Sequence, residues 1–393
     1  MVSTGRGTPP DYPKGGVENE AYLLVNSIAK HVRSVHYVEN LRNWNLPNNV
    51  IVYNVPSSNG YSSTFIAELT TAPILALRVT EEAKKALIGD SIDIIHFHET
   101  RGNLPVHFLS GFSNLPKVLS IHGPIPWMVK YDSRIETFLR VNTYRIFDVS
   151  AFKRLDHLIA VSGWIKKSLI QIGIPDNKIS VVYNPVDTDF FSPEKKLEKR
   201  NKEILNELEL EPSSYLLTVG SLVSRKRHIN LIRAFASYKG EKKLVIVGDG
   251  PEFVNICRWI SKHNLKNRII LIRQVNACLL SYLYANAHAF VTCSMAEGLP
   301  VAIMEAMSSG LGIIFPDSPW IEELLGQDNG VLFSTSSDKS TTDALNLFDK
   351  LASKRFGLTN RNIAERLFSL QACTNKTLKI YEAIIDKKSQ LLS

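Results

Sequence analysis

Short apolar runs alternate with helical patterns along this chain, and the alternation constrains its fold more than any other feature. Stretches with apolar residues at three-to-four spacing, such as residues 17–32, predict helices. Four apolar runs bounded by Asp, Gly, Pro or Asn predict buried strands: VIVYNV (50–55), IDIIHF (92–97), KVLSIH (117–122) and HLIAVS (157–162). Strands and helices that alternate in this way predict parallel sheets covered by helices.

The same pattern returns after a polar, charged segment at residues 184–214. Five further runs predict a second set of strands: YLLTVG (215–220), KLVIVG (243–248), IILI (269–272), AFVTCS (289–294) and LGIIFP (311–316). The segment between the two sets carries prolines near both ends, which suits an inter-domain linker with a surface helix. We therefore expect two doubly wound α/β domains that face each other, with ligands beyond the carboxyl ends of the strands.

Length and composition agree with this prediction. The 393 residues suit two domains, and no apolar run reaches the length of about eighteen residues that predicts a membrane span. No signal-peptide core follows Met1, and the four cysteines share no metal-ligand spacing, so we expect a cytoplasmic, reducing compartment. The formal charge of +8 fits a phosphate-bearing partner, a peripherally contacted membrane surface, or simply a basic surface. No basic stripe interleaves with aromatic residues, so nucleic acid is not expected.

The start of the chain is irregular. Only the residues MVS precede the glycine-containing stretch TGRGTPP, where a first strand is expected. Either that strand is very short or the natural start lies upstream, and we favour the second interpretation.

The stretch MAEGLPVAIMEAM places two glutamates, Glu297 and Glu305, eight residues apart around a helix start. Pro300 suits the first helical position, and Gly310 suits a left-handed cap. The N–H groups at such a helix N-terminus favour an anion such as a diphosphate, with a carboxylate on either side to accept hydrogen bonds from hydroxyls. A nucleotide sugar has this layout. From spacing alone, however, a surface loop and an amphipathic helix with scattered acids explain the glutamates as well.

The stretch resembles the E-x7-E signature of the family 4 retaining glycosyltransferases, which have the GT-B fold. Further motifs resemble that family in the same order and cover nearly the whole chain: PKGGVENEAYLLVNSIAKHV, DIIHFHE, VLSIHGPIP, HLIAVSGWIKKSLIQIGIPDNKISVVYNPVDTDFFSP, TVGSLVSRKRHINLIRAF, LVIVGDGPE and FSLQACTNKTLKIYEAII. The resemblance implies two Rossmann-like domains with a cleft between them. An acceptor-binding domain spans residues 1–185, completed by a return helix at about residues 370–393, and a donor-binding domain spans residues 186–369.

The resemblance also implies a role for each matching residue. Glu297 resembles the glutamate that binds hydroxyls of the transferred sugar, Glu305 the one that binds the ribose, and Lys226 the lysine that pairs with the diphosphate. His122 resembles a histidine beside the donor sugar, although by itself a histidine that ends a buried strand is more often structural. The remaining matches are backbone positions at the donor: Gly15, Gly16, Gly298, Leu299 and the close-packed turn at Gly248.

Two positions depart from the family pattern. The arginine that usually follows the glycine after the first donor-domain strand is Ser221 here, so its contact with the diphosphate is lost. Arg225 or Arg227 can replace it in part, although neither matches the motif position. The usual Asn-Gly of the crossover is Asn184 followed by Pro185, and proline stiffens the hinge because it fixes φ and removes a donor.

The function implied is the transfer of a hexose from a UDP- or GDP-sugar, with UDP favoured, to a hydroxyl of a glycan, lipid-linked or small-molecule acceptor. Configuration is retained, and no cofactor or metal is expected. His96 and His98 share a strand face, but no third ligand accompanies them, so we interpret them as structural. Two alternatives stay open. One is a non-catalytic GT-B protein that binds a glycan or regulates a partner, which Ser221 favours, and the other is a nucleotide-sugar epimerase or a phosphorylase on a similar fold.

Overall fold

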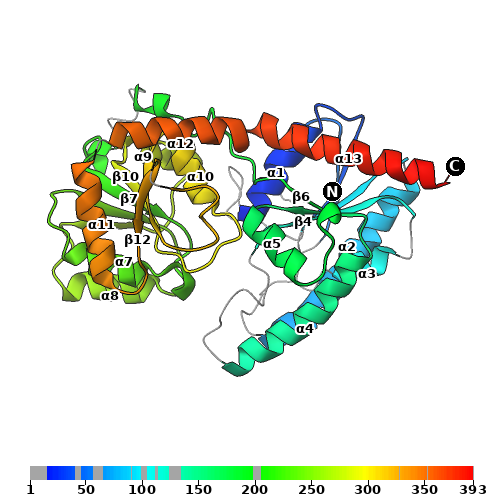
Figure 1. Ribbon diagram of the computed structural model, residues 1–393, viewed down its shortest axis with the longest axis horizontal. Coiled ribbons are helices and arrows are strands. Elements are labelled where there is room, and N and C mark those ends of the chain that lie inside the picture. Colours follow the sequence, from blue (N-terminus) through cyan, green and yellow to red (C-terminus); the bar gives the residue numbers. More distant parts are fainter. Residues whose placement is uncertain are drawn as a thin grey trace. The chain divides into compact units, whose positions relative to one another are not determined.

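The protein divides into two compact units. The structure is a computed structural model that describes residues 16–39, 46–55, 65–89, 91–98, 104–110, 114–123, 134–197, 205–326, 328–351 and 353–392. Unit 1 comprises Met1–Pro185 and Leu370–Ser393, and unit 2 comprises Val186–Ser369. Helices flank parallel strands in both units (Figure 1). The expected first strand lies outside the described residues.

Unit 1 contains a pair of strands and a four-stranded sheet, and every described pairing is parallel. The pair is β1 (Val35–Glu39) with β2 (Val50–Asn54), and the sheet has the order β3 (Ile95–His98), β4 (Lys117–Ile121), β5 (His157–Ala160), β6 (Ile179–Val181). The parallel strands predicted at β2, β3, β4 and β5 are confirmed. Strands β1 and β6 were missed because VHYVE mixes polar and apolar residues and ISV has only three residues.

Helices from both ends of the chain cover unit 1. They are α1 (Gly16–Ile28), α2 (Phe65–Gly89), α3 (Leu104–Ser110), α4 (Arg134–Lys153), α5 (Gly163–Gln171) and α13 (Leu370–Leu392), with a 3₁₀ turn η3 (Asp176–Lys178). Helix α13 packs along α1, so that segments far apart in sequence lie side by side (Figure 1). Tyr381 of α13 shares an apolar cluster with Ala21 and Leu24 of α1, and Thr374 Oγ1 donates to Ser27 Oγ at 2.7 Å.

Unit 2 holds one six-stranded parallel sheet. Its order is β12 (Gly330–Phe333), β11 (Gly312–Pro316), β10 (Ala289–Val291), β7 (Tyr215–Val219), β8 (Lys243–Val247), β9 (Ile269–Ile272). The chain builds outward from β7 in one direction through β8 and β9, and then in the other through β10, β11 and β12. The strand order therefore reverses between β7 and β10, which is where open α/β sheets bind ligands. Strand β12 was not predicted from the sequence.

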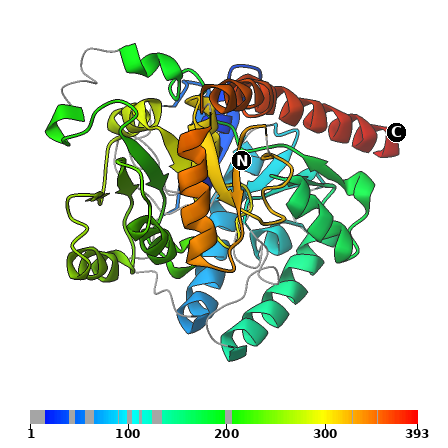
Figure 2. The ribbon, with the colours of Figure 1, turned by 60° about the vertical axis from the view of Figure 1, so that its left-hand side comes forward.

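Helices on both faces bury the sheet of unit 2. They are α7 (His228–Ala236), α8 (Phe253–Lys262), α9 (Ala277–Asn286), α10 (Val301–Ser308), α11 (Asp338–Lys350) and α12 (Ser353–Leu367), with 3₁₀ turns η4 (Pro193–Leu197) and η5 (Ser224–Lys226). Helix α11 lies against the sheet (Figure 2) and contributes Phe348 to a core shared with Phe235 of α7 and Ile246 of β8.

The segment predicted as a linker is partly built into unit 2. Phe191 is fully buried, and its carbonyl oxygen accepts a hydrogen bond from Ser308 Oγ at 2.6 Å. Arg361 Nη1 also donates to the carbonyl oxygens of Thr188 and Phe191, at 2.6 and 3.2 Å. The start of the segment predicted as an inter-domain linker is therefore packed against unit 2, through Phe191 and the contacts of Arg361.

Helix α10 confirms the helix predicted after Glu297, shifted by one residue at its start. Pro300 is the N-cap, with ψ of 110°, and the helix begins at Val301. At the other end Gly310 has φ of +70°, as predicted for a left-handed cap. The amide of Gly310 donates to Met307 O and that of Leu311 to Ala306 O, which is the hydrogen-bond pattern of a Schellman motif.

The loops after β7 and β8 approach so closely that glycine is required where they meet. A Cβ atom on Gly248 would lie 2.0 Å from the carbonyl oxygen of Gly220, and one on Gly250 would lie 2.5 Å from that of Leu222. The amide of Leu222 donates to Asp249 O at 2.8 Å, which ties the two loops together. The glycines thus set the backbone on which the residues after β7 are placed.

Replacing Gly248 by alanine should destabilise unit 2. The added Cβ forces the two loops apart, so we expect the free energy of unfolding to fall by about 1–3 kcal/mol. Gly326→Ala is the matched control, because a Cβ there meets nothing within 4 Å. Thermal unfolding followed by fluorescence measures both variants. Equal melting temperatures for the two would contradict the close approach.

Candidate active site

Three charged side chains meet at the point where the strand order of unit 2 reverses. Arg225 and Lys226 lie on η5, just after β7, and Glu297 lies on the loop between β10 and α10. Lys226 Nζ is 2.5 Å from Glu297 Oε1, and Arg225 Nη1 is 2.9 Å from Glu297 Oε2. Ser294 Oγ donates to Glu297 Oε1 at 2.5 Å. We call Arg225, Lys226 and Glu297 the ion cluster.

The ion cluster keeps a buried carboxylate charged and leaves one positive charge in excess. Burial would raise the pKa of Glu297, but Lys226, Arg225 and the Ser294 hydroxyl together hold it below its ordinary value. The side chain of Glu297 is 10 % exposed, whereas those of Lys226 and Arg225 are 20 % and 34 % exposed. The cations are thus the more accessible members, as a site for an anionic ligand requires.

The backbone between Glu297 and α10 adds to the positive character of this edge. Gly298 and Leu299 connect Glu297 to the helix, Leu299 is buried, and the N-cap residue Pro300 provides no side-chain cap. The amides of the first helical turn and the helix dipole therefore face the same edge as Lys226. This arrangement suits a phosphate group, although the contacts implied for Gly298 and Leu299 stay predictions.

Glu305 occupies a separate environment within α10. Its carboxylate Oε2 accepts a hydrogen bond from Tyr284 Oη of α9 at 2.9 Å, and the residue is 6 % exposed. Burial raises the pKa of Glu305 to about 7, against the opposing effect of the Tyr284 hydroxyl. Glu305 is thus partly protonated near neutral pH, and it can both donate and accept hydrogen bonds. Tyr284 was not predicted from the sequence, because nothing in YLYAN marks which tyrosine contacts Glu305.

Of the two arginines that can replace the missing one at Ser221, Arg225 rather than Arg227 contacts Glu297. Arg225 contacts Glu297 and also donates to the carbonyl oxygen of Ala296, whereas Arg227 Nη1 points to Thr335 O at 3.5 Å. His228, which begins α7, is buried close to Lys226. Burial and the Lys226 charge lower the pKa of His228 to about 4, so it is a neutral neighbour of the ion cluster.

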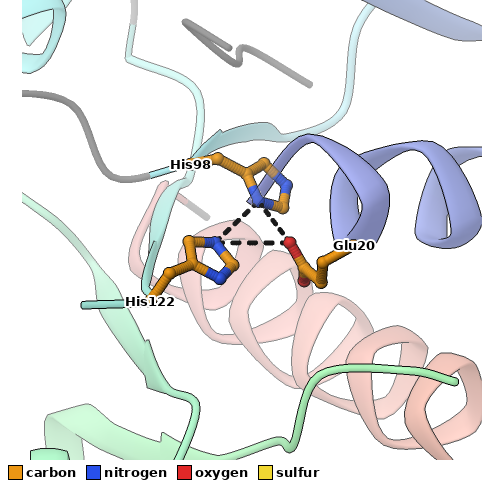
Figure 3. Close-up of side chains that lie close together, drawn as sticks. All are labelled: Glu20, His98 and His122. Carbon is orange, nitrogen blue, oxygen red and sulfur yellow. Dashed lines mark hydrogen bonds and ion pairs between the residues drawn. The ribbon is translucent and has the colours of Figure 1, made fainter. Parts of the chain in front are cut away.

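His122 belongs to a buried cluster in unit 1 that includes two residues not predicted as functional. Glu20 reaches from α1 toward His98 at the end of β3 and His122 just after β4 (Figure 3). His98 Nδ1 and His122 Nε2 are 3.0 Å apart, and they lie 3.1 and 3.3 Å from Glu20 Oε2. His122 Nδ1 lies 3.3 Å from Asn184 Oδ1. We call Glu20, His98 and His122 the unit 1 cluster.

The groups of the unit 1 cluster have strongly shifted pKa values. Burial raises the pKa of Glu20 to about 7, with an opposing effect of His122. Burial lowers the pKa of His98 to about 3 and also lowers that of His122. Both imidazoles are therefore neutral at neutral pH and keep a basic nitrogen each.

The remaining predicted residues fall in several places. His96 stacks on His98 but is not part of the cluster, because its ring nitrogens contact Tyr381 Oη at 2.5 Å and Ser120 Oγ at 2.8 Å. Gly16 is the first residue of α1, and Gly15 lies outside the described residues. Gly248 lies at the close approach of the β7 and β8 loops.

Two family models match successive parts of this chain. The model for Glycosyltransferase Family 4 matches residues 14–190, and the model for glycosyl transferases group 1 matches residues 200–362. The chain belongs to glycosyltransferase family 4. The recognition made from the E-x7-E stretch is confirmed, and the ion cluster is part of a glycosyltransferase.

Relatives and a solved structure agree with this assignment. The O-antigen chain mannosyltransferase RfbU of Salmonella typhimurium is 26 % identical over 63 % of this chain and 69 % of its own length. The UDP-Gal:alpha-D-GlcNAc-diphosphoundecaprenol alpha-1,3-galactosyltransferase of Escherichia coli is 30 % identical over 58 % and 59 %. The Anabaena protein HepE in complex with UDP-glucose superposes with a TM-score of 0.71, at 18 % identity, over 97 % of this chain and 98 % of HepE. The glycosyltransferase thus has the GT-B fold, as predicted.

Within the described ranges, no helix of this glycosyltransferase combines the length and apolar character needed to cross a membrane.

The raised pKa of Glu305 predicts a pH dependence of stability. Because the folded pKa of about 7 lies above the unfolded value of 4.5, the folded state keeps a proton that the unfolded state loses. The contribution of this carboxyl is therefore fully present below pH 4.5 and is lost as the pH rises to about 7, on the order of 3 kcal/mol. Glu305→Gln should flatten the fall in melting temperature between pH 5 and pH 7.5.

Glu241→Gln is the control, because Glu241 is an exposed carboxylate of the same unit. Its melting temperature should follow the wild-type pH profile. A Glu305→Gln profile as steep as that of the wild type would show that Glu305 titrates normally.

Proposed function

We propose that this glycosyltransferase moves a hexose from a UDP- or GDP-sugar to an acceptor hydroxyl, with retention of configuration and without a metal ion at the diphosphate. The ion cluster carries the proposal. A carboxylate held between two accessible cations, at the switch point of a parallel sheet, matches the charge pattern of a sugar diphosphate.

The excess positive charge of the ion cluster suits the diphosphate. A nucleotide diphosphate can pair with Lys226 and Arg225, while the helix N-terminus at α10 adds N–H donors. As bonds to the leaving group break, negative charge grows on the phosphate oxygens, and Lys226 is the group that stabilises it. These residues supply positive charge at the site where other transferases use a metal ion.

Glu297 then binds the transferred sugar rather than acting as a nucleophile. Two cations and a hydroxyl hold its oxygens 2.5 to 2.9 Å away, so the carboxylate stays charged and fixed in place. Such a carboxylate accepts hydrogen bonds from sugar hydroxyls well, but it attacks a carbon poorly. We therefore favour front-face transfer, in which the acceptor oxygen bonds to the anomeric carbon as the phosphate departs. The leaving phosphate oxygen takes the acceptor's proton.

Glu305 and the backbone positions complete the proposed donor site. Glu305 binds the ribose hydroxyls, and Gly298 and Leu299 offer backbone donors to the sugar and phosphates. Gly248 permits the close loop packing behind them. The family motifs also imply roles at the donor for Gly15, Gly16 and His122 of unit 1, and these three roles rest on the motifs alone.

The donor base and acceptor are inferred from relatives. The Escherichia coli relative carries UDP-Gal and a diphosphoundecaprenol acceptor in its name, and HepE was solved with UDP-glucose. We therefore favour a UDP-sugar as donor and a lipid-linked glycan as acceptor. The non-catalytic alternative rests on Ser221, but Arg225 lies against Glu297, so the site keeps two cations near the diphosphate position.

Nucleotide titration tests this proposal most directly. Calorimetry with UDP, GDP, ADP and dTDP, first without metal and then with magnesium, should show one preferred nucleotide whose binding magnesium does not change. Lys226→Ala should weaken that binding about 10- to 100-fold, because a charge-assisted contact is lost. Glu297→Ala should keep nucleotide binding but lower the rate of transfer by about 100-fold or more.

Lys239→Ala is the matched control, because it removes an exposed lysine of unit 2 outside the ion cluster. Binding and transfer should both stay at wild-type levels. Full transfer by Glu297→Ala would contradict the proposed role of Glu297 in binding the transferred sugar. Absence of binding of every nucleotide would favour a non-catalytic GT-B protein.

A lipid-linked acceptor also predicts contact with a membrane surface. The chain has a net charge of +8. On α4, Phe138 and Ile146 lie two helical turns apart, with 68 % and 70 % of their surface exposed. Flotation with vesicles that contain anionic lipid should recover the protein at low salt and lose it at high salt. Phe138→Asp should reduce recovery, whereas Leu358→Asp, an equally exposed leucine of unit 2, should not. Absence of flotation at low salt would remove this part of the proposal.

A further inference from the structure

We propose that Glu20, His98 and His122 form a binding site for a divalent transition-metal ion in unit 1. The site lies outside the ion cluster, and it shares only His122 with the donor roles that the family motifs imply. Its three ligand atoms are Glu20 Oε2, His98 Nδ1 and His122 Nε2 (Figure 3). Two imidazoles and one carboxylate are a frequent ligand set for zinc and for iron(II).

The three atoms have the spacing of ligands around one ion. They form a nearly equilateral triangle with sides of 3.0, 3.1 and 3.3 Å. An ion about 1 Å out of this plane would lie about 2.1 Å from each atom, which is the usual zinc–nitrogen and zinc–oxygen distance. The angles between ligands would then be about 90–105°, so the triangle fits one face of an octahedral or a distorted tetrahedral site.

Hydrogen bonds within the cluster leave one oxygen of the Glu20 carboxylate unsatisfied. Glu20 Oε2 is buried and makes no hydrogen bond to any described residue, although both ring nitrogens lie within 3.3 Å. One proton between His98 Nδ1 and His122 Nε2 satisfies that pair and leaves the oxygen without a donor. An ion would interact with all three lone pairs at once and would offset the cost of burying the carboxylate.

The second contact of His122 orients its lone pair toward the proposed ion. His122 Nδ1 faces Asn184 Oδ1 at 3.3 Å, and an amide oxygen accepts a hydrogen bond, so the proton belongs on Nδ1. Nε2 then carries the lone pair that faces Glu20 and His98. A partner on the far nitrogen is the usual way in which proteins orient a metal-binding imidazole. His98 can carry its proton on Nε2, which leaves Nδ1 as its ligand atom.

Such an ion would cross-link three elements of unit 1. Glu20 lies on α1, His98 ends β3, and His122 follows β4, so one ion would join the helix to the carboxyl ends of two neighbouring strands. His98 and His122 are 24 residues apart in the sequence, whereas Glu20 lies near the start of the chain. An ion that binds the folded state alone raises its stability in proportion to the logarithm of the free ion concentration.

Cobalt titration tests the site without any assay of transfer. Full-length protein is stripped with a chelator, dialysed and titrated with Co²⁺, whose visible absorption reports coordination by nitrogen and oxygen ligands. We expect one equivalent bound per chain, competition by Zn²⁺, and a melting temperature that rises with Zn²⁺ concentration. Nucleotide binding by unit 2, measured without metal, should not change, so failure of this site is distinguishable from failure of the donor site.

Two variants decide whether the cluster is the site. Glu20→Gln keeps the side chain's shape and should weaken Co²⁺ binding at least about 100-fold, because a charged ligand is lost. His98→Gln should give the same loss and covers the case in which Glu20→Gln does not fold. His157→Gln is the matched control, since His157 lies on β5 and bonds to Ser180 Oγ at 2.9 Å. Wild-type binding no stronger than that of Glu20→Gln, or a loss in His157→Gln of equal size, would overturn the proposal.

Discussion

Glu297 is a buried carboxylate that stays charged, and the local structure of unit 2 is organised around that fact. Its charge requires two cations, and both come from the turn after the neighbouring strand of the switch point. That turn holds its position because glycines let the β7 and β8 loops come within contact distance of each other. Loop packing, strand order and the start of α10 at Val301 therefore all serve to place one negative charge between two positive ones.

Much of this arrangement could be predicted from sequence, because it is local. Long apolar strands such as KLVIVG, the turn after AFVTCS and the cap at Gly310 each carry their signal within a few residues, and the E-x7-E stretch places both glutamates on one strand–loop–helix unit. Strands β1, β6 and β12 were not predicted; VHYVE of β1 mixes polar and apolar residues, and β6 has only three residues. The pairing of Arg225 with Glu297 could not be predicted, since two loops about seventy residues apart in sequence determine it.

The unit 1 cluster shows the same limit more clearly. His96 and His98 are alternate residues of one strand, so the sequence predicts that they share a face, yet their side chains contact different partners. His96 contacts Tyr381 from the far end of the chain, whereas His98 meets Glu20 and His122. Strand order and the return of α13 decide these partners, and neither is encoded near the histidines.

The return of α13 has a consequence for the order in which the protein is made. Unit 2 is one continuous segment, Val186–Ser369, and it leaves the ribosome with all of its strands present. Unit 1 is split, and the apolar cluster around Ala21, Leu24 and Val25 of α1 includes Tyr381 of α13, with Leu378 and Ile385 packed against it. The unit synthesised first therefore finishes folding last, because α13 packs on the apolar face of α1 only after the C-terminus has been synthesised.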